Sequence, residues 1–404
     1  MVMYYHVLNN IYVVRGAKYC CIYDLPNNRL HKITNIACDI LDKVILGENI
    51  LDIHEKKFMD SLAQLGVVHE VSSPILDYRS IEQDYSYERK IDFAWIEITN
   101  SCNLKCIHCY NEHSSISKTM LSLDDFKYIV DQLCSVGIQK VQLIGGEPFV
   151  LKKETLYSMM DYLSAKVKSF EIFTNGTIAT DEDWKEIKSR YDNISVATSL
   201  HSYIKNEHEY VTQIKGSFQK SENTIRILRT LNIPFRYVGT LIGGVNIGKT
   251  EELGAPSRRD FVRLSGKANL SLYDDKLLKE RIITKESMHL GNLKDSIKSI
   301  YEENCFSTHL YIGSNLNVYP CPMERRLCHG NLKDVTLKKI LKPQILNFSK
   351  KEVEGCKDCE YRYLCRDCRA DSLNGDLREK PWYCTYNPYE GTWETFDEFK
   401  KRIL

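Results

Sequence analysis

Short apolar runs typical of strands alternate, in the central part of the chain, with longer stretches whose apolar residues recur at helical spacing. Five runs are predicted strands: 93–99 (FAWIEIT), 140–145 (KVQLIG), 169–174 (SFEIFT), 194–200 (ISVATSL) and 235–242 (FRYVGTLI). The helical stretches between them are 123–137, capped by Ser122, and then 153–166, 182–190 and 218–232. Such repeated units predict an α/β fold with a parallel sheet or barrel, whose functional residues gather at the carboxyl ends of the strands.

Residues 1–77 have a different pattern and form a separate small unit. Three β-rich runs, IYVVRGA, KYCCIYDL and RLHKITN, come first, and Asn27 and Asn28 mark a hairpin turn between the last two. Two helical stretches follow and end at Gly47 and Gly66. Strands followed by helices predict a winged-helix-like domain. The polar segment 78–90 is the expected linker to the next domain.

Composition places the chain among ordinary globular proteins of two or three domains, since it has 404 residues, 43% of them hydrophobic. The 55 basic and 54 acidic residues nearly cancel, which disfavours nucleic acid or an anionic membrane as a partner. No apolar run reaches the roughly 18 residues of a membrane span. The N-terminus lacks the features of a signal peptide, so a cytoplasmic location is expected.

Cysteine is the unusual residue, with 15 copies unevenly placed. Three form one tight group, eight lie within 305–384, and 135–304 contains none. In a reducing cytosol such cysteines are expected to be metal ligands rather than structural disulfides. The cysteines with no expected ligand role are Cys20, Cys21, Cys38 and Cys134.

The tight group follows the first predicted strand of the α/β region with the spacing Cys102-x3-Cys106-x2-Cys109. Three thiolates within eight residues can bind three irons of a [4Fe–4S] cluster and leave the fourth iron open. A zinc site normally draws on two Cys or Cys/His pairs, and the absence of a second pair nearby disfavours zinc. The alternatives are a chance triplet and a zinc site completed by His108 or His113.

This motif, in this position, resembles the signature of the radical SAM superfamily. His108 departs from it, because the family commonly has an aromatic residue there. The resemblance implies a partial (β/α)6 TIM-like barrel over 91–300, with S-adenosylmethionine (SAM) at the open iron. It also implies that reduction of the cluster cleaves SAM to methionine and a 5′-deoxyadenosyl radical, which abstracts a hydrogen from the substrate.

The second predicted strand ends in Gly145, Gly146 and Glu147, followed by Pro148. Alone, this could be a glycine turn that opens a helix. At this position it resembles the family's GGE motif, in which backbone and glutamate hold the SAM ammonium group. Glycines allow close backbone approach, and a carboxylate can pair with a cation.

Three further strand positions resemble SAM-binding positions of the family. Asn175 follows the third strand, and Ser199 ends the fourth, where relatives place a polar residue near the ribose. Arg236, on the fifth strand, resembles an arginine that meets the SAM carboxylate. A purely structural role is the alternative for each of the three.

The second cysteine group contains two C-x2-C pairs separated by five residues, which makes a zinc ribbon one alternative, although ribbons usually have a longer spacer. After a radical SAM barrel, the group resembles a SPASM domain, here 301–404, which holds two auxiliary [4Fe–4S] clusters. The last central spacing is x2 rather than x3, and Leu316 replaces a glycine often found before VYPC.

The SPASM resemblance implies two ligand sets. The outer set is Cys356, Cys359, Cys365 and Cys384. The inner set is Cys305, Cys321 and Cys368, with Cys328 as the candidate fourth ligand. Alternatively, Cys328 is a bystander and the inner cluster keeps one iron free for substrate. With the SAM-binding cluster, three [4Fe–4S] clusters are expected.

The N-terminal unit resembles the leader-recognition element of ribosomal-peptide maturases, a winged helix that binds a leader peptide by adding a strand to its sheet. A capping domain without a ligand is the alternative. The chain is therefore predicted to be a peptide maturase that installs cross-links, most simply thioethers, in a precursor peptide. An electron donor such as flavodoxin or ferredoxin is an expected partner.

Other functions remain open at this stage. Carbon–carbon cross-linking and epimerisation are alternatives within peptide maturation. Sulfatase maturation is disfavoured, because Pro322 follows Cys321 where those enzymes usually have an aspartate. A non-catalytic iron–sulfur protein that binds peptides is disfavoured by the intact cysteine motif with Glu147.

Overall fold

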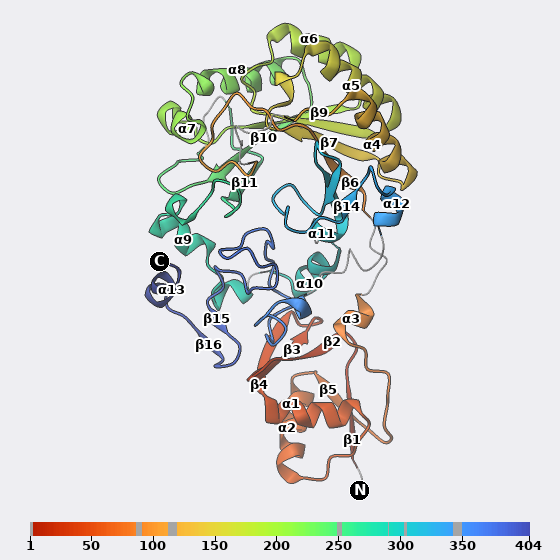
Figure 1. Cartoon of the computed structure of the whole chain (residues 1–404). Helices are drawn as coiled ribbons and strands as arrows, with labels where there is room; N and C mark the ends of the chain where they lie inside the picture. The colour runs from red at the N-terminus through yellow and green to blue at the C-terminus, as the bar shows by residue number, and fades with distance from the viewer. Residues whose placement is uncertain are drawn as a thin grey trace.

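The computed structural model describes residues 3–85, 91–111, 119–248, 253–289, 291–302, 305–341 and 350–404. Figure 1 shows the N-terminal module at one end of an elongated molecule and the α/β part at the other. Much of the C-terminal part lies between them.

The N-terminal module contains two small sheets and two helices. Strand β1 (Tyr4–Val7) pairs with β5 (Val68–Val71), and β2 (Ile11–Arg15), β3 (Tyr19–Asp24) and β4 (Arg29–Thr34) form an antiparallel sheet. The helices are α1 (Asn35–Ile45) and α2 (Ile53–Gln64). The three predicted strands and two predicted helices are confirmed, whereas β1 and β5, of four residues each, were too short to predict.

A disulfide corrects one expectation in this module. Cys20 on β3 is bonded to Cys38 on α1, with a Cα–Cα distance of 6.3 Å. Both side chains are fully buried where the helix lies on the sheet. The expectation that the chain's cysteines form no structural disulfide is therefore wrong for this pair. Alternation along β3 turns Cys21 to the other face, among tyrosines of the C-terminal part.

The central sheet has nine strands in the order β11-β10-β9-β8-β7-β6-β12-β13-β14. Strands β6 (Phe93–Thr99), β7 (Lys140–Gly145), β8 (Ser169–Thr174), β9 (Ile194–Ser199), β10 (Phe235–Leu241) and β11 (Arg258–Phe261) are parallel. The five predicted strands are confirmed. The sixth, β11, has the sequence RRDF and so carried no apolar signal.

Strands from the C-terminal part extend this sheet at β6. They are β12 (His309–Ile312), which is parallel to β6, and the antiparallel β13 (Asn317–Tyr319) and β14 (Gly330–Asn331). The parallel α/β sheet predicted from the sequence is therefore present, with three additional strands at one edge.

Helices cover the outer side of the sheet, as Figure 1 shows. They are α4 (Leu123–Ser135), α5 (Lys153–Lys166), α6 (Asp181–Arg190), α7 (Lys205–Thr212) and α8 (Ser217–Thr230). Ser122 caps α4 as predicted, since its hydroxyl accepts from the Asp125 amide at 3.0 Å. Ala94, Ile96 and Ile98 of β6 belong to the core beneath the helices. The alternate residues, including Glu97, face the barrel interior.

The remaining elements are short. They are α3 (Ile81–Asp84), α9 (Asp275–Arg281), α10 (Leu293–Glu302), α11 (Cys305–Thr308), α12 (Leu337–Ile340), β15 (Tyr386–Asn387), β16 (Thr392–Trp393) and α13 (Phe396–Ile403). The 3-10 turns are 148–150, 270–272, 286–289 and 350–352. Among the helices of the described residues, none has the length and apolar character needed to cross a bilayer.

Candidate active site

The three clustered cysteines lie in the loop that follows β6, which we call the first cysteine loop (residues 100–111). Helix α7 supports the loop, because the amides of Lys105 and Ile107 donate to carbonyl oxygens at its end at 3.1 and 3.0 Å. All three cysteine side chains are half-buried. The structure therefore places them at the carboxyl end of the first barrel strand, as predicted.

The thiols lie close enough to interact electrostatically. Burial raises the pKa of Cys102 to about 11 and that of Cys106 to about 12, and the neighbouring thiols, Cys109 among them, raise both further. Three buried thiols in one loop need a cation before they lose their protons together. This donor set fits an iron–sulfur cluster, whose ligands are thiolates.

Gly145 and Gly146, at the end of β7, lie against the start of the first cysteine loop. A Cβ atom on Gly145 would lie 2.2 Å from the Thr99 carbonyl oxygen, and one on Gly146 would lie 2.2 Å from that of Ser101. Only glycine fits at either position. The close backbone approach expected of these glycines is therefore made here to the cysteine loop itself.

Glu147 is fully buried and joins the ends of β7 and β8. Its carboxylate accepts from the Thr174 hydroxyl at 2.7 Å, the Asn175 amide at 2.6 Å and the Phe149 amide at 3.1 Å. Burial raises the pKa of Glu147 to about 7. Its role toward a SAM ammonium group stays a prediction.

The other three predicted SAM contacts occupy different surroundings. The side-chain nitrogen Nδ2 of Asn175 lies 2.8 Å from Asn103 Oδ1 and 3.8 Å from Cys102 Sγ, so the Asn175 side chain contacts the first cysteine loop. Ser199 is half-buried at the end of β9. Arg236 is held by Glu171, with Nε–Oε1 at 2.9 Å and Nη2–Oε2 at 2.8 Å. The pairing of Arg236 with SAM therefore also stays a prediction.

His108, the departure from the family pattern, belongs to a buried row of imidazoles. Its ring lies edge-on to that of His201 at 4.7 Å, and His201 stacks on His208 at 5.6 Å. Burial lowers the pKa of His108 to about 4, so its ring is neutral near pH 7. His108 thus packs as an aromatic residue. His208 was missed in the sequence because it lies in the unpredicted helix α7.

The structure gathers the predicted outer set. Electrostatic interactions join Cys356 to Cys365 and Cys384, and Cys359 to Cys356 and Cys384. Burial raises the pKa of the Cys356 thiol to about 11, while the cations of Lys350 and Arg369 oppose that rise. In the described part of the chain, no three metal-binding side chains are arranged for one metal ion. That these four cysteines hold an auxiliary iron–sulfur cluster rather than zinc stays a prediction.

The inner set is more dispersed. The Cys368 thiol interacts with Arg263 and Asp371. Cys321 opens the segment between β13 and β14 and is half-buried, whereas Cys328 is exposed with its Sγ 3.6 Å from the Gly330 carbonyl oxygen. The Cys305 side chain lies outside the described residues. Whether Cys328 is a ligand stays open.

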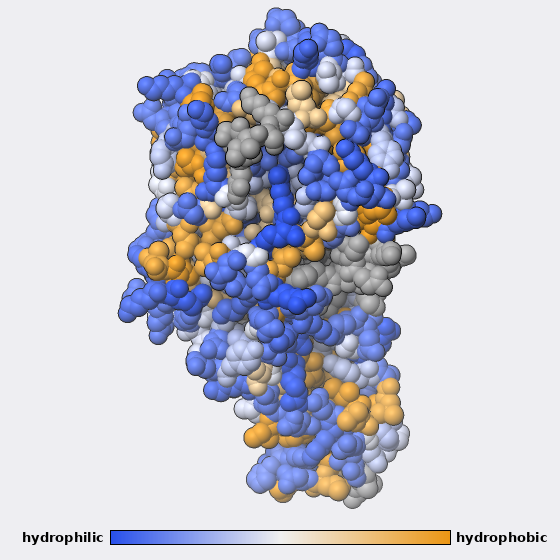
Figure 2. All heavy atoms as spheres, viewed as in Figure 1, coloured by the Kyte–Doolittle hydropathy of each residue, from blue (hydrophilic) through white to orange (hydrophobic). Residues whose placement is uncertain are grey.

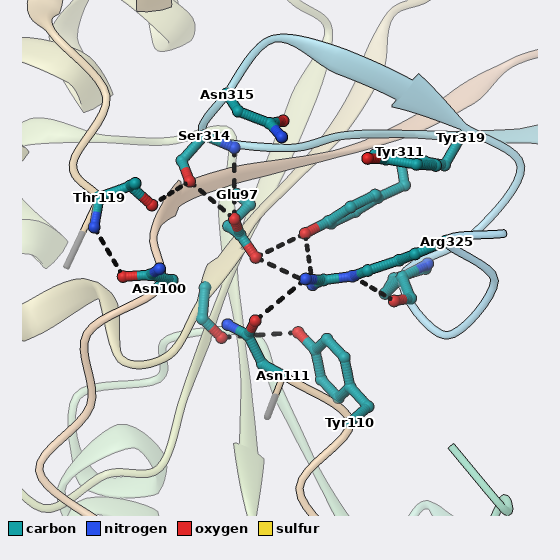
Figure 3. Close-up of polar contacts among 12 residues, drawn as sticks. Glu97, Asn100, Tyr110, Asn111, Thr119, Tyr311, Ser314, Asn315, Tyr319 and Arg325 are labelled. Carbon is teal, nitrogen blue, oxygen red and sulfur yellow. Dashed lines mark hydrogen bonds and ion pairs between the residues drawn. The ribbon is translucent and has the colours of Figure 1, made fainter. Parts of the chain in front are cut away.

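Sequence reasoning missed a polar network inside the barrel, shown in Figure 3. It centres on Glu97 of β6, which accepts from Tyr311 of β12 and from Arg325. The signal was present, because Glu97 is a charged residue in the otherwise apolar run FAWIEIT. A charge buried in a strand needs a partner.

Two protein families match parts of the chain. Residues 96–254 match the radical SAM superfamily. Residues 304–369 match SPASM, an iron–sulfur cluster-binding domain.

Three curated proteins are similar in sequence. The antilisterial bacteriocin subtilosin biosynthesis protein AlbA of Bacillus subtilis (strain 168) is 35% identical over 135 residues, 33% of this chain and 30% of AlbA. The sporulation killing factor maturation protein SkfB of the same strain is 27% identical over 284 residues, 65% of this chain and 67% of SkfB. An AdoMet-dependent heme synthase of Methanosarcina barkeri (strain Fusaro / DSM 804) is 27% identical over 343 residues, 73% of this chain and 96% of the synthase.

A solved structure shares the fold. Streptococcus suis SuiB bound to S-adenosylmethionine superposes with a TM-score of 0.51 at 14% identity, over 91% of this chain and 96% of SuiB. The superposition covers nearly the whole of both chains. The chain therefore shares the overall fold of SuiB and contains a radical SAM match and a SPASM match within it.

Proposed function

Because the chain is a radical SAM protein with a SPASM domain, we propose that it is a peptide maturase that cross-links a ribosomally made precursor. The observation that carries the proposal is the placement of three thiols at the carboxyl end of β6 together with the outer set of four thiols. AlbA and SkfB, both named for making or maturing peptide products, support it.

Cys102, Cys106 and Cys109 would hold the SAM-binding [4Fe–4S] cluster. When bound, this cluster and SAM supply a carbon radical that can remove a hydrogen atom from an unactivated position. The chain's own residues shape the site around that chemistry. Glu147 and Asn175 fix the ends of β7 and β8 against the first cysteine loop.

Two auxiliary [4Fe–4S] clusters complete the proposal. Cys356, Cys359, Cys365 and Cys384 would hold the outer one, and Cys305, Cys321 and Cys368 the inner one, with Cys328 or a substrate thiolate as fourth ligand. Forming a thioether removes two electrons and two protons from the peptide, and the radical accepts only one hydrogen atom. The second electron requires an acceptor, which a cluster held by the auxiliary cysteines would supply, and the second proton would leave the peptide thiol to solvent.

The N-terminal module is the proposed leader-binding site. Within the described residues, β4 pairs only with β3, so its other edge is free to accept a peptide strand. Apolar surface also marks this end of the molecule in Figure 2. The exposed apolar side chains of the module include Ile36, Leu46, Leu51, Ile53 and Leu76.

The test uses anaerobically reconstituted protein with SAM and dithionite. Wild-type protein should release 5′-deoxyadenosine and contain about twelve irons per chain. Cys102→Ala should release none. Cys134→Ala, which changes a cysteine on α4 outside both ligand groups, should behave as wild type. An intact cluster that releases no 5′-deoxyadenosine would contradict the enzyme proposal.

The linkage is tested with a short precursor peptide sought in the reading frames that neighbour the gene. A product that has lost two hydrogens per cross-link and one free thiol per cross-link supports a thioether. Loss of hydrogens with all thiols still free supports a carbon–carbon link, and an unchanged mass with an inverted centre supports epimerisation. Conversion of a haem precursor instead of the peptide would favour the chemistry named for the Methanosarcina relative.

A further inference from the structure

Two consecutive arginines lie between β13 and β14, in a segment that we call the arginine loop (residues 320–329). They reach in opposite directions. Arg326 pairs with buried Glu324, Nε to Oε1 at 2.9 Å, and donates to the Arg369 carbonyl oxygen at 3.1 Å, toward the C-terminal part. Arg325 instead enters the barrel. The loop is thereby attached on both sides.

Arg325 contacts three segments of the barrel, as Figure 3 shows. Its Nη2 donates to Glu97 Oε2 at 3.0 Å and to the Tyr311 hydroxyl at 2.7 Å. Its Nη1 donates to Asn111 Oδ1 at 3.1 Å, and Nε donates back to the Pro322 carbonyl oxygen at 3.2 Å. One guanidinium therefore connects β6, β12, the first cysteine loop and its own loop.

Glu97 explains why the arginine stays in place. The Glu97 side chain is 5% exposed, and its carboxylate also accepts the Tyr311 hydroxyl at 2.5 Å and the Ser314 hydroxyl at 2.8 Å. A carboxylate buried in a barrel wall requires a charged partner, and Arg325 is the cation that pairs with it. The Glu97 carboxylate is also held by Ser314, and the Arg325 guanidinium is also held by Asn111.

The same guanidinium lies beside the residue that follows the third cysteine. Its carbon is 5.7 Å from the centre of the Tyr110 ring, and the Tyr110 hydroxyl lies 3.5 Å from the Gly145 carbonyl oxygen. Arg325 thus contacts both residues that directly follow Cys109, through the Tyr110 ring and the Asn111 side chain.

We propose that Arg325 is a positioning residue that holds the arginine loop, with Cys321 and Cys328, against the first cysteine loop at a separation set by Glu97. The benefit of this positioning depends on the proposed function. A peptide side chain bound at the arginine loop would thereby be held at a constant distance from the first cysteine loop, where the hydrogen-abstracting radical would be generated. A displacement of about 1 Å at such a site can cost about 100-fold in rate.

The test measures hydrogen exchange in the reconstituted, substrate-free holoenzyme. Arg325→Met keeps an aliphatic side chain and removes every hydrogen bond made by the guanidinium group. We expect exchange to rise about tenfold or more both in the arginine loop and at Tyr110 and Asn111, since bonds to charged groups are lost. Arg325→Lys, which can still pair with Glu97, should restore part of the protection at Tyr110 and Asn111.

Controls separate positioning from general damage. Arg258→Met removes an exposed arginine that pairs with Asp260 on β11, and it should change neither loop. Glu97→Gln removes the charge and leaves one oxygen that can accept from Tyr311 or Ser314, so it should loosen both loops if Arg325→Met does not fold. Exchange that rises in the arginine loop alone, or throughout the chain, overturns the proposal. Because no turnover is needed, this outcome is independent of whether the enzyme cross-links peptides.

Discussion

At the scale of single residues, His208 shows how burial fixes a protonation state. Its Nδ1 accepts the backbone amide of His201 at 3.2 Å, so that nitrogen carries no proton. The ring also lies 5.8 Å from that of Phe218. Burial lowers the pKa of His208 to about 4. Protonation would both charge a buried ring and break the bond to His201.

This predicts a pH-dependent stability. The unfolded chain binds a proton at His208 near pH 6.5 and the folded chain only near pH 4, so stability is complete above 6.5 and falls as the pH drops. His208 contributes about 3 kcal/mol to this pH-dependent part of the free energy of unfolding. Urea unfolding between pH 4 and 7 should show a flatter dependence for His208→Asn, whose amide oxygen can still accept from His201. Parallel curves for the two proteins would refute this.

Gly146 carries a second residue-scale prediction. A methyl group there would overlap the Ser101 carbonyl oxygen, so Gly146→Ala must move the first cysteine loop. Overpacking of this kind costs about 1–3 kcal/mol. We expect lower iron loading at the SAM-binding cluster after reconstitution, while the outer set, far along the chain, still binds iron. Iron analysis and electron paramagnetic resonance check this, and full loading of all clusters would contradict it.

At the scale of elements, apolar periodicity predicted what packs against the main core and missed what does not. Strands β6 to β10 carry buried apolar residues on at least one face and were found. Strand β11 is polar, and helix α7 has an uncapped start at Ile204, so neither gave a signal. The cysteine spacing identified both candidate ligand groups, whose role as ligands stays a prediction. The Glu97–Arg325 pair was not predicted, because its partners lie 228 residues apart.

The disulfide of the N-terminal module is an element-scale feature with a measurable effect. It joins β3 to α1 across 18 residues, and closing a loop of that size stabilises a fold by about 3 kcal/mol. We expect Cys38→Ala to lower the free energy of unfolding of the module by that amount, as followed by hydrogen exchange in β3. Cys134→Ala serves as the control. Equal stability of wild type with and without a reductant would contradict the expectation.

At the scale of the whole molecule, the N-terminal module is attached to the segment that bears the outer cysteine set. The Ala17 amide donates to the Asp358 carbonyl oxygen at 2.7 Å, and the Tyr23 hydroxyl donates to that of Glu360 at 2.7 Å. Both acceptors flank Cys359 in the sequence. The N-terminal module is therefore bonded directly to the segment that carries the predicted outer cysteine set.

Removing one such bond should loosen the attachment. Tyr23→Phe deletes a buried hydroxyl and with it the hydrogen bond to the Glu360 carbonyl oxygen. Losing this bond should lower the free energy of unfolding by about 1 kcal/mol or more. We expect faster hydrogen exchange in 356–365 and unchanged exchange in the barrel. Tyr389→Phe removes an exposed bond to the Asp358 side chain and is the matched control. An equal effect of the two variants would contradict the assignment.

The addition of β12 to β6 has a consequence for biosynthesis. Tyr311 and Glu97, bonded across this strand pair, lie 214 residues apart, so the barrel edge is completed only after most of the chain has left the ribosome. Until then β6 is an edge strand with unpaired backbone groups, and Glu97 lacks its partner Tyr311. An exposed edge of this kind can pair with other nascent chains. A chain shortened before β12 should aggregate rather than fold as an independent barrel, and chaperones should be needed during the interval.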